Sequence, residues 1–414
     1  MFVLKGVATE AAVAIDSVPN QKRAAEPNRF HPASSEVARD INRRIVLNLI
    51  RRRHPISRAD LARASGLQRS TVSLIVEQLI AEQWVVEGAT GRLPRGRRPT
   101  FLRLNDERVI IGVDIRPIQI TVAVSDANGN FTAQETMATP ADPKRAISEL
   151  VTRIQRVVRG CKDKKIEGIG ISVPGRIDER SNRLVFSPNL KWSGLDMRTP
   201  IANATGLSVQ LENAANACVL AAVWFDHIES RNLVVITVSE GIGAGVLLNG
   251  QLVHGENGFA GEFGHVPLDP KGPLCGCGQH GCWEVFASNN AALRYYFEST
   301  KNAGDLSFLD LMHRADQGDT RAAAALKKMA QYLGRGARTI VAGLAPNRII
   351  VVGDLTRAWH HFGPVIEAEM HPETLPGGSA PPIIPAHDDG MDRLRGTVAL
   401  VLQNDFGLNR EIPA

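Results

Sequence analysis

Three of the five cysteines in the chain, Cys275, Cys277 and Cys282, lie within eight consecutive positions. In a chain whose cysteines stay reduced, such a cluster favours a metal site over disulfide bonds. Two histidines, His265 and His280, are close by. One His and three Cys form the ligand set of a closed tetrahedral zinc site, and the glycines between them allow a tight loop. The sequence therefore predicts a structural zinc ion (Zn2+) here, with reduced free thiols as the alternative.

The composition is that of a globular protein with more than one domain. Its 414 residues exceed one ordinary core, and 43% of them are hydrophobic against 22% charged. The remaining cysteines, Cys161 and Cys218, are isolated in the sequence, and we expect them to be buried packing residues. No apolar run reaches the ~18 residues of a membrane helix, and no secretory signal pattern is present. We therefore expect a cytoplasmic protein.

Positive charge is concentrated in one N-terminal segment. Residues 36–104 contain 14 Arg against six Asp and Glu, although the net charge of the whole chain is only +5. This asymmetry indicates a nucleic-acid-binding head on a neutral or slightly acidic body. A solvated basic face without a partner is the alternative. Residues 1–35 show no sustained periodicity, so we expect a flexible arm there and assign it no function.

The basic segment has the pattern of a helix-turn-helix. Apolar residues at helical spacing predict a helix over 37–52, and two shorter helices follow it. Ser57 is a suitable N-cap for the first of these two, and Gly66 fits the turn between them. Gln68 or Ser70 opens the second helix. The apolar positions of the three helices are spaced to form one small core.

The start of the third helix carries side chains suited to DNA. A helix-turn-helix places its second helix in the major groove, with the N-terminal residues of that helix on base edges. Arginine pairs with guanine and glutamine with adenine through two hydrogen bonds each, and hydroxyl groups bind bases or phosphate. A small helical packing module is the alternative, but it would not need these polar residues. The predicted DNA contacts are Gln68, Arg69, Ser70, Thr71 and Ser73.

A basic wing is predicted to follow. Residues 85–87 and 100–104 have the pattern of a short hairpin, and the segment between them is rich in Gly and Arg. Arginines on extended backbone suit the narrow, negative minor groove. We therefore expect Arg95, Arg97 and Arg98 to contact DNA, with a solvated flexible linker as the alternative.

Beyond a linker near residues 104–108 the pattern changes to alternating strands and helices, which is typical of an α/β domain. No internal repeat and no low-complexity tract interrupts it. The clearest predicted elements are strands at 109–115, 118–125 and 166–172, a hairpin turn at Asn128–Gly129, and a helix at 142–159.

The most specific stretch runs from Gly261 to Glu284. It contains a Glu-x-Gly-His element at 262–265 and a Cys-x-Cys-Gly-x-x-Gly-Cys-x-Glu element at 275–284. With the Gly-x-Gly-x-Gly run at 241–245, these elements resemble the signature of the ROK family of repressors, open reading frames and sugar kinases. The resemblance extends from about residue 109 to the C-terminus. The head separately resembles the winged heads of sugar-operon repressors.

This resemblance implies a fold and a ligand. The body, residues 105–414, is expected to be a two-lobed actin-like, hexokinase-like (RNase H-like) α/β domain with a sugar cleft between the lobes. A homodimer or homotetramer is also implied. The resemblance favours His265 over His280 as the zinc ligand. Family residues that contact sugar hydroxyls match Asn213, Glu262, His265 and Glu284, and further cleft positions match Gly175 and Asn189.

The chemistry of these residues supports their assignment to a sugar site. A sugar needs carboxylates and amides that form several hydrogen bonds with it at once. For Glu262 or Glu284 taken singly, a solvated surface carboxylate is the ordinary interpretation. Their positions on either side of the metal loop favour the sugar site instead.

The kinase motifs of the family are altered in this chain. Kinases carry an Asp as general base where this sequence has Ala214, and a methyl group accepts no proton. The first phosphate loop lacks its glycines and has Arg116 after Asp114, and a later Gly-Gly pair is Gly353-Asp354. The remaining glycines at 241–245 are weak evidence for nucleotide binding.

The sequence thus favours a sugar-responsive transcription regulator that is not an enzyme. Its partners would be double-stranded operator DNA and a sugar or sugar-phosphate effector, with no membrane. We expect a repressor of carbohydrate uptake or catabolic genes. One alternative is a sugar kinase fused to a DNA-binding head, and another is a regulator controlled by a partner protein. The sequence leaves open which sugar binds and which operator is read.

Overall fold

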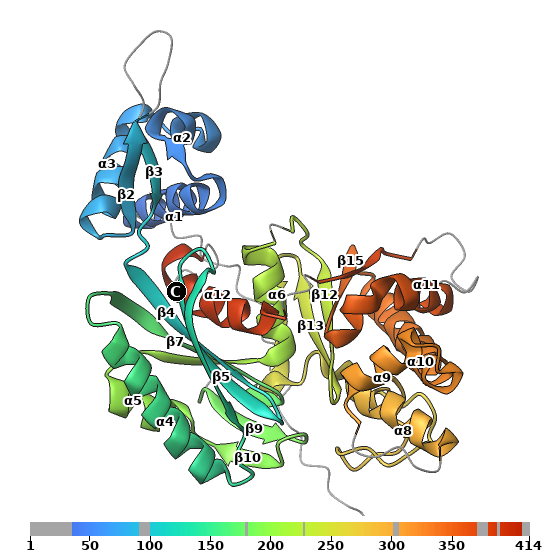
Figure 1. Ribbon diagram of the computed structural model, residues 1–414. Helices are drawn as coiled ribbons and strands as arrows, with labels where there is room; N and C mark the ends of the chain where they lie inside the picture. Colours follow the sequence, from blue (N-terminus) through green and yellow to red (C-terminus); the bar gives the residue numbers. More distant parts are fainter. Residues whose placement is uncertain are drawn as a thin grey trace, which may run out of the picture. The chain divides into compact units, whose positions relative to one another are not determined.

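The computed structural model describes residues 35–90, 100–178, 181–226, 228–300, 306–370, 380–386 and 390–407. The chain divides into two units, Met1–Ile41 and Asn42–Ala414, with the boundary inside helix α1 (Ser35–Arg53). Every described element after α1 belongs to the second unit. Figure 1 labels the elements along the chain.

The N-terminal part of the second unit folds as a winged helix-turn-helix. Helix α1 is followed by α2 (Arg58–Ser65) and α3 (Arg69–Ala81). The side chain of Ser57 accepts a hydrogen bond from the Asp60 amide, and Gly66 ends α2 with a φ of 71°, as the sequence predicted. Gln68 is the N-cap of α3 but makes no side-chain capping bond.

The wing strands β2 (Val85–Thr90) and β3 (Thr100–Leu104) are antiparallel. A third strand, β1 (Ile56–Ser57), pairs with the other edge of β3. The sequence analysis missed β1, because two residues show no alternation. The helices and the sheet share an apolar core that continues into the body. Its buried members in the head include Leu47, Ile50, Leu61, Val72, Val76, Leu79, Trp84 and Leu102.

The first lobe of the body contains a five-stranded sheet with the order β11-β7-β4-β5-β6. Helix α4 (Pro143–Gly160) packs on one face, where Ile111 and Val113 are buried with it. Helix α5 (Arg198–Thr205) contributes to the same core. The strands are β4 (Arg108–Ile115), β5 (Gln119–Asp126), β6 (Phe131–Ala138), β7 (Lys165–Val173) and β11 (Val209–Asn213).

The second lobe contains another five-stranded sheet, with the order β14-β13-β12-β15-β16. Its strands are β12 (Leu233–Val238), β13 (Ile242–Leu248), β14 (Gln251–Leu252), β15 (Arg348–Val352) and β16 (Ile383–Pro385). Helices gather beside this sheet in Figure 1, namely α8 (Asn289–Ser299), α9 (Phe308–Asp316), α10 (Thr320–Leu344) and α11 (Trp359–Met370). Val234, Ile236 and Val238 of β12 are buried in the core that these helices form.

Two helices, α6 (Ala214–Trp224) and α12 (Asp392–Phe406), join the lobes. Helix α12 packs on β4 and β7 of the first sheet, α6 packs on β12 and β13 of the second, and the two helices pack against each other. Their approach is close. A Cβ at Gly396 of α12 would lie 1.9 Å from the backbone oxygen of Ala217 in α6. This sheet-helix-helix-sheet arrangement is the predicted hexokinase-like body.

Among the described residues, no helix combines the length and apolarity that crossing a bilayer requires.

Candidate functional site

The four predicted metal ligands come together in the folded chain. One ligand atom from each of His265, Cys275, Cys277 and Cys282 lies within 4.8 Å of all the others. The Nδ1 atom of His265 is 3.5 Å from the Cys275 Sγ, and the Sγ atoms of Cys277 and Cys282 are 3.6 Å apart. His280 is not in the cluster, because it is exposed and its Nδ1 contacts the Gly272 carbonyl. Among the described residues, His265 and not His280 groups with the three cysteines.

The loop that carries the cysteines depends on its glycines. Gly281 has a φ of 68°, and a Cβ there would lie 1.5 Å from the Asp269 carbonyl oxygen. Single β-bridges join Pro267 to Cys282 and Leu274 to His280. The loop is thus folded back on itself, which brings cysteines seven positions apart at its two ends to one point.

The donor set fits a divalent cation. Burial raises the pKa of the Cys282 thiol to about 11, and burial also raises the pKa of Cys275. Buried thiols of this kind remain protonated near neutral pH unless a cation stabilises the thiolates. Four protein ligands leave no open coordination position, as in structural rather than catalytic zinc sites.

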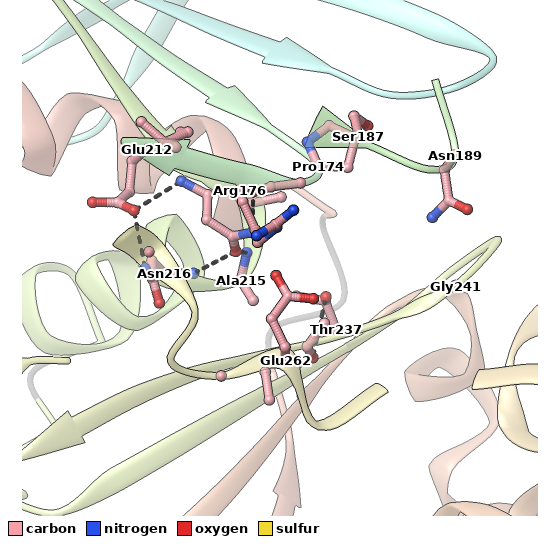
Figure 2. A pocket seen from close by; sticks show the side chains of 18 of the residues that line it. Pro174, Arg176, Ser187, Asn189, Glu212, Ala215, Asn216, Thr237, Gly241 and Glu262 are labelled. Carbon is pink, nitrogen blue, oxygen red and sulfur yellow. Dashed lines mark hydrogen bonds between the residues drawn. The ribbon is translucent and has the colours of Figure 1, made fainter. Parts of the chain in front are cut away.

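A cavity of about 760 Å³ adjoins the cluster, between the lobes of the body. This volume lies within the range of small-molecule sites. All six predicted sugar-site residues line it: Gly175, Asn189, Asn213, Glu262, His265 and Glu284. Figure 2 shows Asn189 and Glu262 on different segments around this cavity.

His265 belongs to both the metal cluster and the cavity. Its Nδ1 faces Cys275, whereas its Nε2 lies 3.6 Å from the Oε2 of Glu262. Burial raises the pKa of Glu262, and the charges of His265 and Arg176 oppose that shift. Both Glu262 and His265 lie in a single 3-10 turn, Glu262–His265. One turn thus carries a cavity carboxylate and a metal ligand.

Glu284 connects the same two features. Its Oε2 accepts a hydrogen bond from the Ile242 amide at 3.2 Å, and its Oε1 lies 3.2 Å from the Cys275 Sγ. Gly241 leaves room for this carboxylate, because a Cβ there would lie 2.3 Å from the Glu284 Oε2 and 2.8 Å from the Asn189 Nδ2. The glycine therefore allows Asn189 and Glu284 to converge at the cavity wall.

Asn213 has a structural role that the sequence analysis did not predict. It is the N-cap of α6, and its Oδ1 accepts hydrogen bonds from the amides of Ala215 and Asn216. Its Nδ2 donates to the Gly175 carbonyl at 2.8 Å. The side chain is therefore fixed, and its amide nitrogen has one further hydrogen for a ligand in the cavity.

The comparisons with known proteins agree with this geometry. The model of the ROK family matches residues 110–404. The chain belongs to the ROK family. It is 32% identical over 324 residues to the xylose repressor of Bacillus subtilis (strain 168), covering 77% of this chain and 83% of the repressor.

The proteins that resemble the chain also include kinases. The glucokinase of Thermotoga maritima is 32% identical over 279 residues, which cover 62% of this chain and 86% of the kinase. Among solved structures, a ROK family transcriptional regulator, a homolog of the E. coli MLC protein, matches with a TM-score of 0.76 at 24% identity. That match covers 89% of this chain and 98% of the other and confirms the ROK fold.

The sequence analysis missed several cavity residues. Glu212 accepts hydrogen bonds from the Asn213 amide and the Asn216 side chain, and its other oxygen lies 2.9 Å from the His254 Nε2. Glu212 lies two residues before Ala214, the position compared with the kinase base in the sequence analysis, whereas no motif marked His254. Arg176 also lines the cavity, where its guanidinium lies 4.1 Å from the centre of the Phe259 ring. In Figure 2, Arg176 and Glu262 point toward one another.

The structure describes the surroundings of the positions at which the sequence analysis expected altered kinase motifs. Ala214 is the first residue of α6 and is buried at the cavity wall. The Asp114 carboxylate pairs with the Arg116 Nε at 2.7 Å and accepts a hydrogen bond from Ser172. Arg116 and Asp354 both line a second cavity, which has a volume of only about 50 Å³.

The predicted DNA contacts of the head are partly described. Gln68, Arg69 and Ser70 are exposed, and Thr71 and Ser73 are half-buried, at and after the start of α3. The predicted wing contacts Arg95, Arg97 and Arg98 lie outside the described residues.

Proposed function

We propose that the chain is a sugar-responsive DNA-binding regulator, and specifically a repressor of carbohydrate uptake or catabolic genes. The observation that carries the proposal is a sugar-sized cavity lined by carboxylates and amides in a ROK body, in the same chain as a winged helix-turn-helix. The similarity to a xylose repressor over 77% of the chain supports it. The domains would be an arm at 1–35, a head at 36–104 and a sensor at 105–414.

The sugar site would consist of Asn213, Glu262, His265 and Glu284, with Gly175 and Asn189 beside them. Carboxylate oxygens of Glu262 and Glu284 accept hydrogen bonds from sugar hydroxyls, and amides both donate and accept. The ligand class is a sugar or a sugar phosphate.

The metal would be zinc, held by His265, Cys275, Cys277 and Cys282. A bound zinc stabilises the Cys275–Cys282 loop and fixes the direction of the His265 ring. The Nε2 of that ring is then presented to the cavity in one orientation. The ion would have a structural role, and the sugar would be held by the protein side chains.

Phosphoryl transfer is not part of the proposal. The position of the family's general base is Ala214, and the position of the first phosphate loop carries the Asp114–Arg116 ion pair. These features support a binding protein over the alternative, a sugar kinase with a DNA-binding head.

DNA binding would reside in the exposed start of α3, at Gln68, Arg69, Ser70, Thr71 and Ser73, and in the wing arginines Arg95, Arg97 and Arg98. The excess of Arg over acidic residues in 36–104 provides the electrostatic attraction to phosphate. We expect a homodimer or homotetramer in the cytoplasm, because a symmetric regulator reads two half-sites.

A thermal-shift screen of sugars and sugar phosphates tests the sensor function, because a ligand of the folded state raises its melting temperature by mass action. The sugar that stabilises the chain is then incubated with ATP and Mg²⁺. We expect stabilisation by at least one sugar and no sugar-dependent ATP turnover. Sugar phosphorylation would instead establish the kinase alternative.

A further inference from the structure

One apolar side chain interrupts the polar face of α3. Leu74 is 69% exposed, whereas Val72, Ile75, Val76 and Leu79 of the same helix are buried in the head core and Ile80 is partly buried against it. Leu74 therefore contributes little to that core. An isolated exposed leucine is ordinary on a protein surface, so its position relative to other functional groups decides its meaning.

Leu74 lies on the helix face that carries the proposed DNA contacts. It follows Ser70 by four residues, and residues four apart share one face of a helix. It is about 6 Å further along the helix axis than Ser70. If the face that carries Ser70 enters a major groove, Leu74 also lies against the bases.

In the major groove of DNA, only one base offers an apolar group to a side chain such as leucine. In the major groove, guanine, adenine and cytosine present hydrogen-bond donors and acceptors, and thymine alone adds an apolar group, its C5-methyl. A leucine placed against the other bases would remove their polar edges from water without replacing the lost hydrogen bonds. Against thymine it buries a methyl group instead.

We infer that Leu74 reads a thymine methyl group in each half-site of the operator. This inference rests on the proposed DNA-binding function and names a specificity determinant within it. The charge of the segment suits DNA as the occupant of this face, because residues 36–104 contain 14 Arg against six Asp and Glu and the exposed Arg69 begins α3. Leu74 would select for thymine and against cytosine, which offers an amino group at the neighbouring position.

The test removes the methyl group from the DNA and the leucine from the protein. The full chain first selects its operator from random duplexes, and each thymine of a half-site is then replaced singly by deoxyuridine. At one thymine the native chain should lose affinity about fourfold, as expected for one unburied methyl group. Leu74→Ala should bind the thymine and deoxyuridine duplexes equally at that position. The control is Leu309→Ala, at an apolar residue in α9 that is 42% exposed, and it should retain the fourfold difference.

Two results would overturn this inference and leave the proposed DNA-binding function intact. The affinity of the native chain could be the same with and without every methyl group, or Leu74→Ala could keep the full difference in affinity between thymine and deoxyuridine. Weaker self-association of Leu74→Ala in sedimentation, without a change in methyl dependence, would also overturn it by showing that a second copy covers this face. Failure of the native chain to select any duplex would contradict the proposed DNA-binding function itself, and this inference with it.

Discussion

His265 shows how one residue can belong to two sites. Its Nδ1 faces the cysteine cluster, and its Nε2 faces Glu262 in the cavity. Glu284 has a similar double position, with one oxygen near Cys275 and the other on the Ile242 amide. We therefore predict that removal of the proposed zinc ion would disturb the cavity as well as the loop, because His265 and Glu284 contact both.

Replacing a cysteine tests the metal ligands. We expect purified native protein to contain about one zinc ion per chain and Cys277→Ser to contain much less, with a lower melting temperature, because a closed site loses one of its four ligands. Metal analysis by mass spectrometry and thermal unfolding measure both effects. Cys161→Ser is the control, because Cys161 lies outside the cluster. A full zinc content in Cys277→Ser would show that the ligand assignment is wrong.

Replacing Arg69 tests base recognition by the DNA-binding head. A bidentate hydrogen bond between arginine and guanine discriminates between bases. Arg69→Ala should therefore weaken operator binding by about 1–3 kcal/mol and weaken non-specific binding much less. Fluorescence titrations with operator and scrambled duplexes at several salt concentrations measure the difference. An equal loss on both duplexes would make Arg69 a phosphate contact rather than a base contact.

At the scale of elements, α6 extends from the cavity toward the head. Its N-cap, Asn213, lines the cavity, and the carbonyl of Trp224 at its other end accepts a hydrogen bond from Arg51 of α1. The Arg51 guanidinium lies 4.5 Å from the centre of the Trp224 ring, and burial lowers the pKa of this guanidinium to about 10. The Phe406 ring of α12 contacts both Trp224 and Trp84. These contacts connect α6 and α12 with residues of the head.

Two glycine-to-alanine substitutions test the close packing of α12 on α6. Gly396→Ala would place a Cβ 1.9 Å from the Ala217 backbone oxygen, so the helices must separate, and we expect a loss of about 1–3 kcal/mol in the free energy of unfolding. Gly343→Ala in α10 has no atom within 4 Å of the added Cβ and should be neutral or stabilising. Urea unfolding compares the two. Equal stability would show that the α6–α12 contact tolerates separation.

The sequence predicted elements whose signals are local. Ser57, Gly66 and the Asn128–Gly129 turn follow from caps and turns that act over a few residues, and they appear where predicted. The metal cluster was predictable because its cysteines are near one another in the chain. Cys161 and Cys218 are buried, as expected.

Contacts between distant segments were not predictable. The pairing of Glu212 with His254 depends on how β11 meets the segment after β14, and neither residue type alone indicates a partner 42 positions away. The same holds for Arg51 and Trp224, which are 173 positions apart. Asn213 was predicted as a sugar contact from the family resemblance, but its capping of α6 depends on the backbone of β11 and α6.

At the scale of the whole molecule, the central claim is that sugar and DNA binding are coupled. Each ligand shifts a conformational equilibrium only by its differential affinity for the two states, and the coupling must be reciprocal. A two-lobed body that closes around a sugar would rotate its lobes, and in a dimer such a rotation changes the spacing of the heads. We expect the sugar to release the regulator from its operator.

The most direct test is operator affinity with and without the stabilising sugar, for the native chain and for Glu262→Gln. The native chain should bind operator about 5- to 150-fold more weakly when saturated with sugar, as a coupling of about 1–3 kcal/mol predicts. Glu262→Gln should keep its affinity for operator without sugar and lose most of the response, because it lacks one cavity carboxylate. If the native chain binds sugar with unchanged operator affinity, the account is contradicted, and control by a partner protein becomes the better explanation.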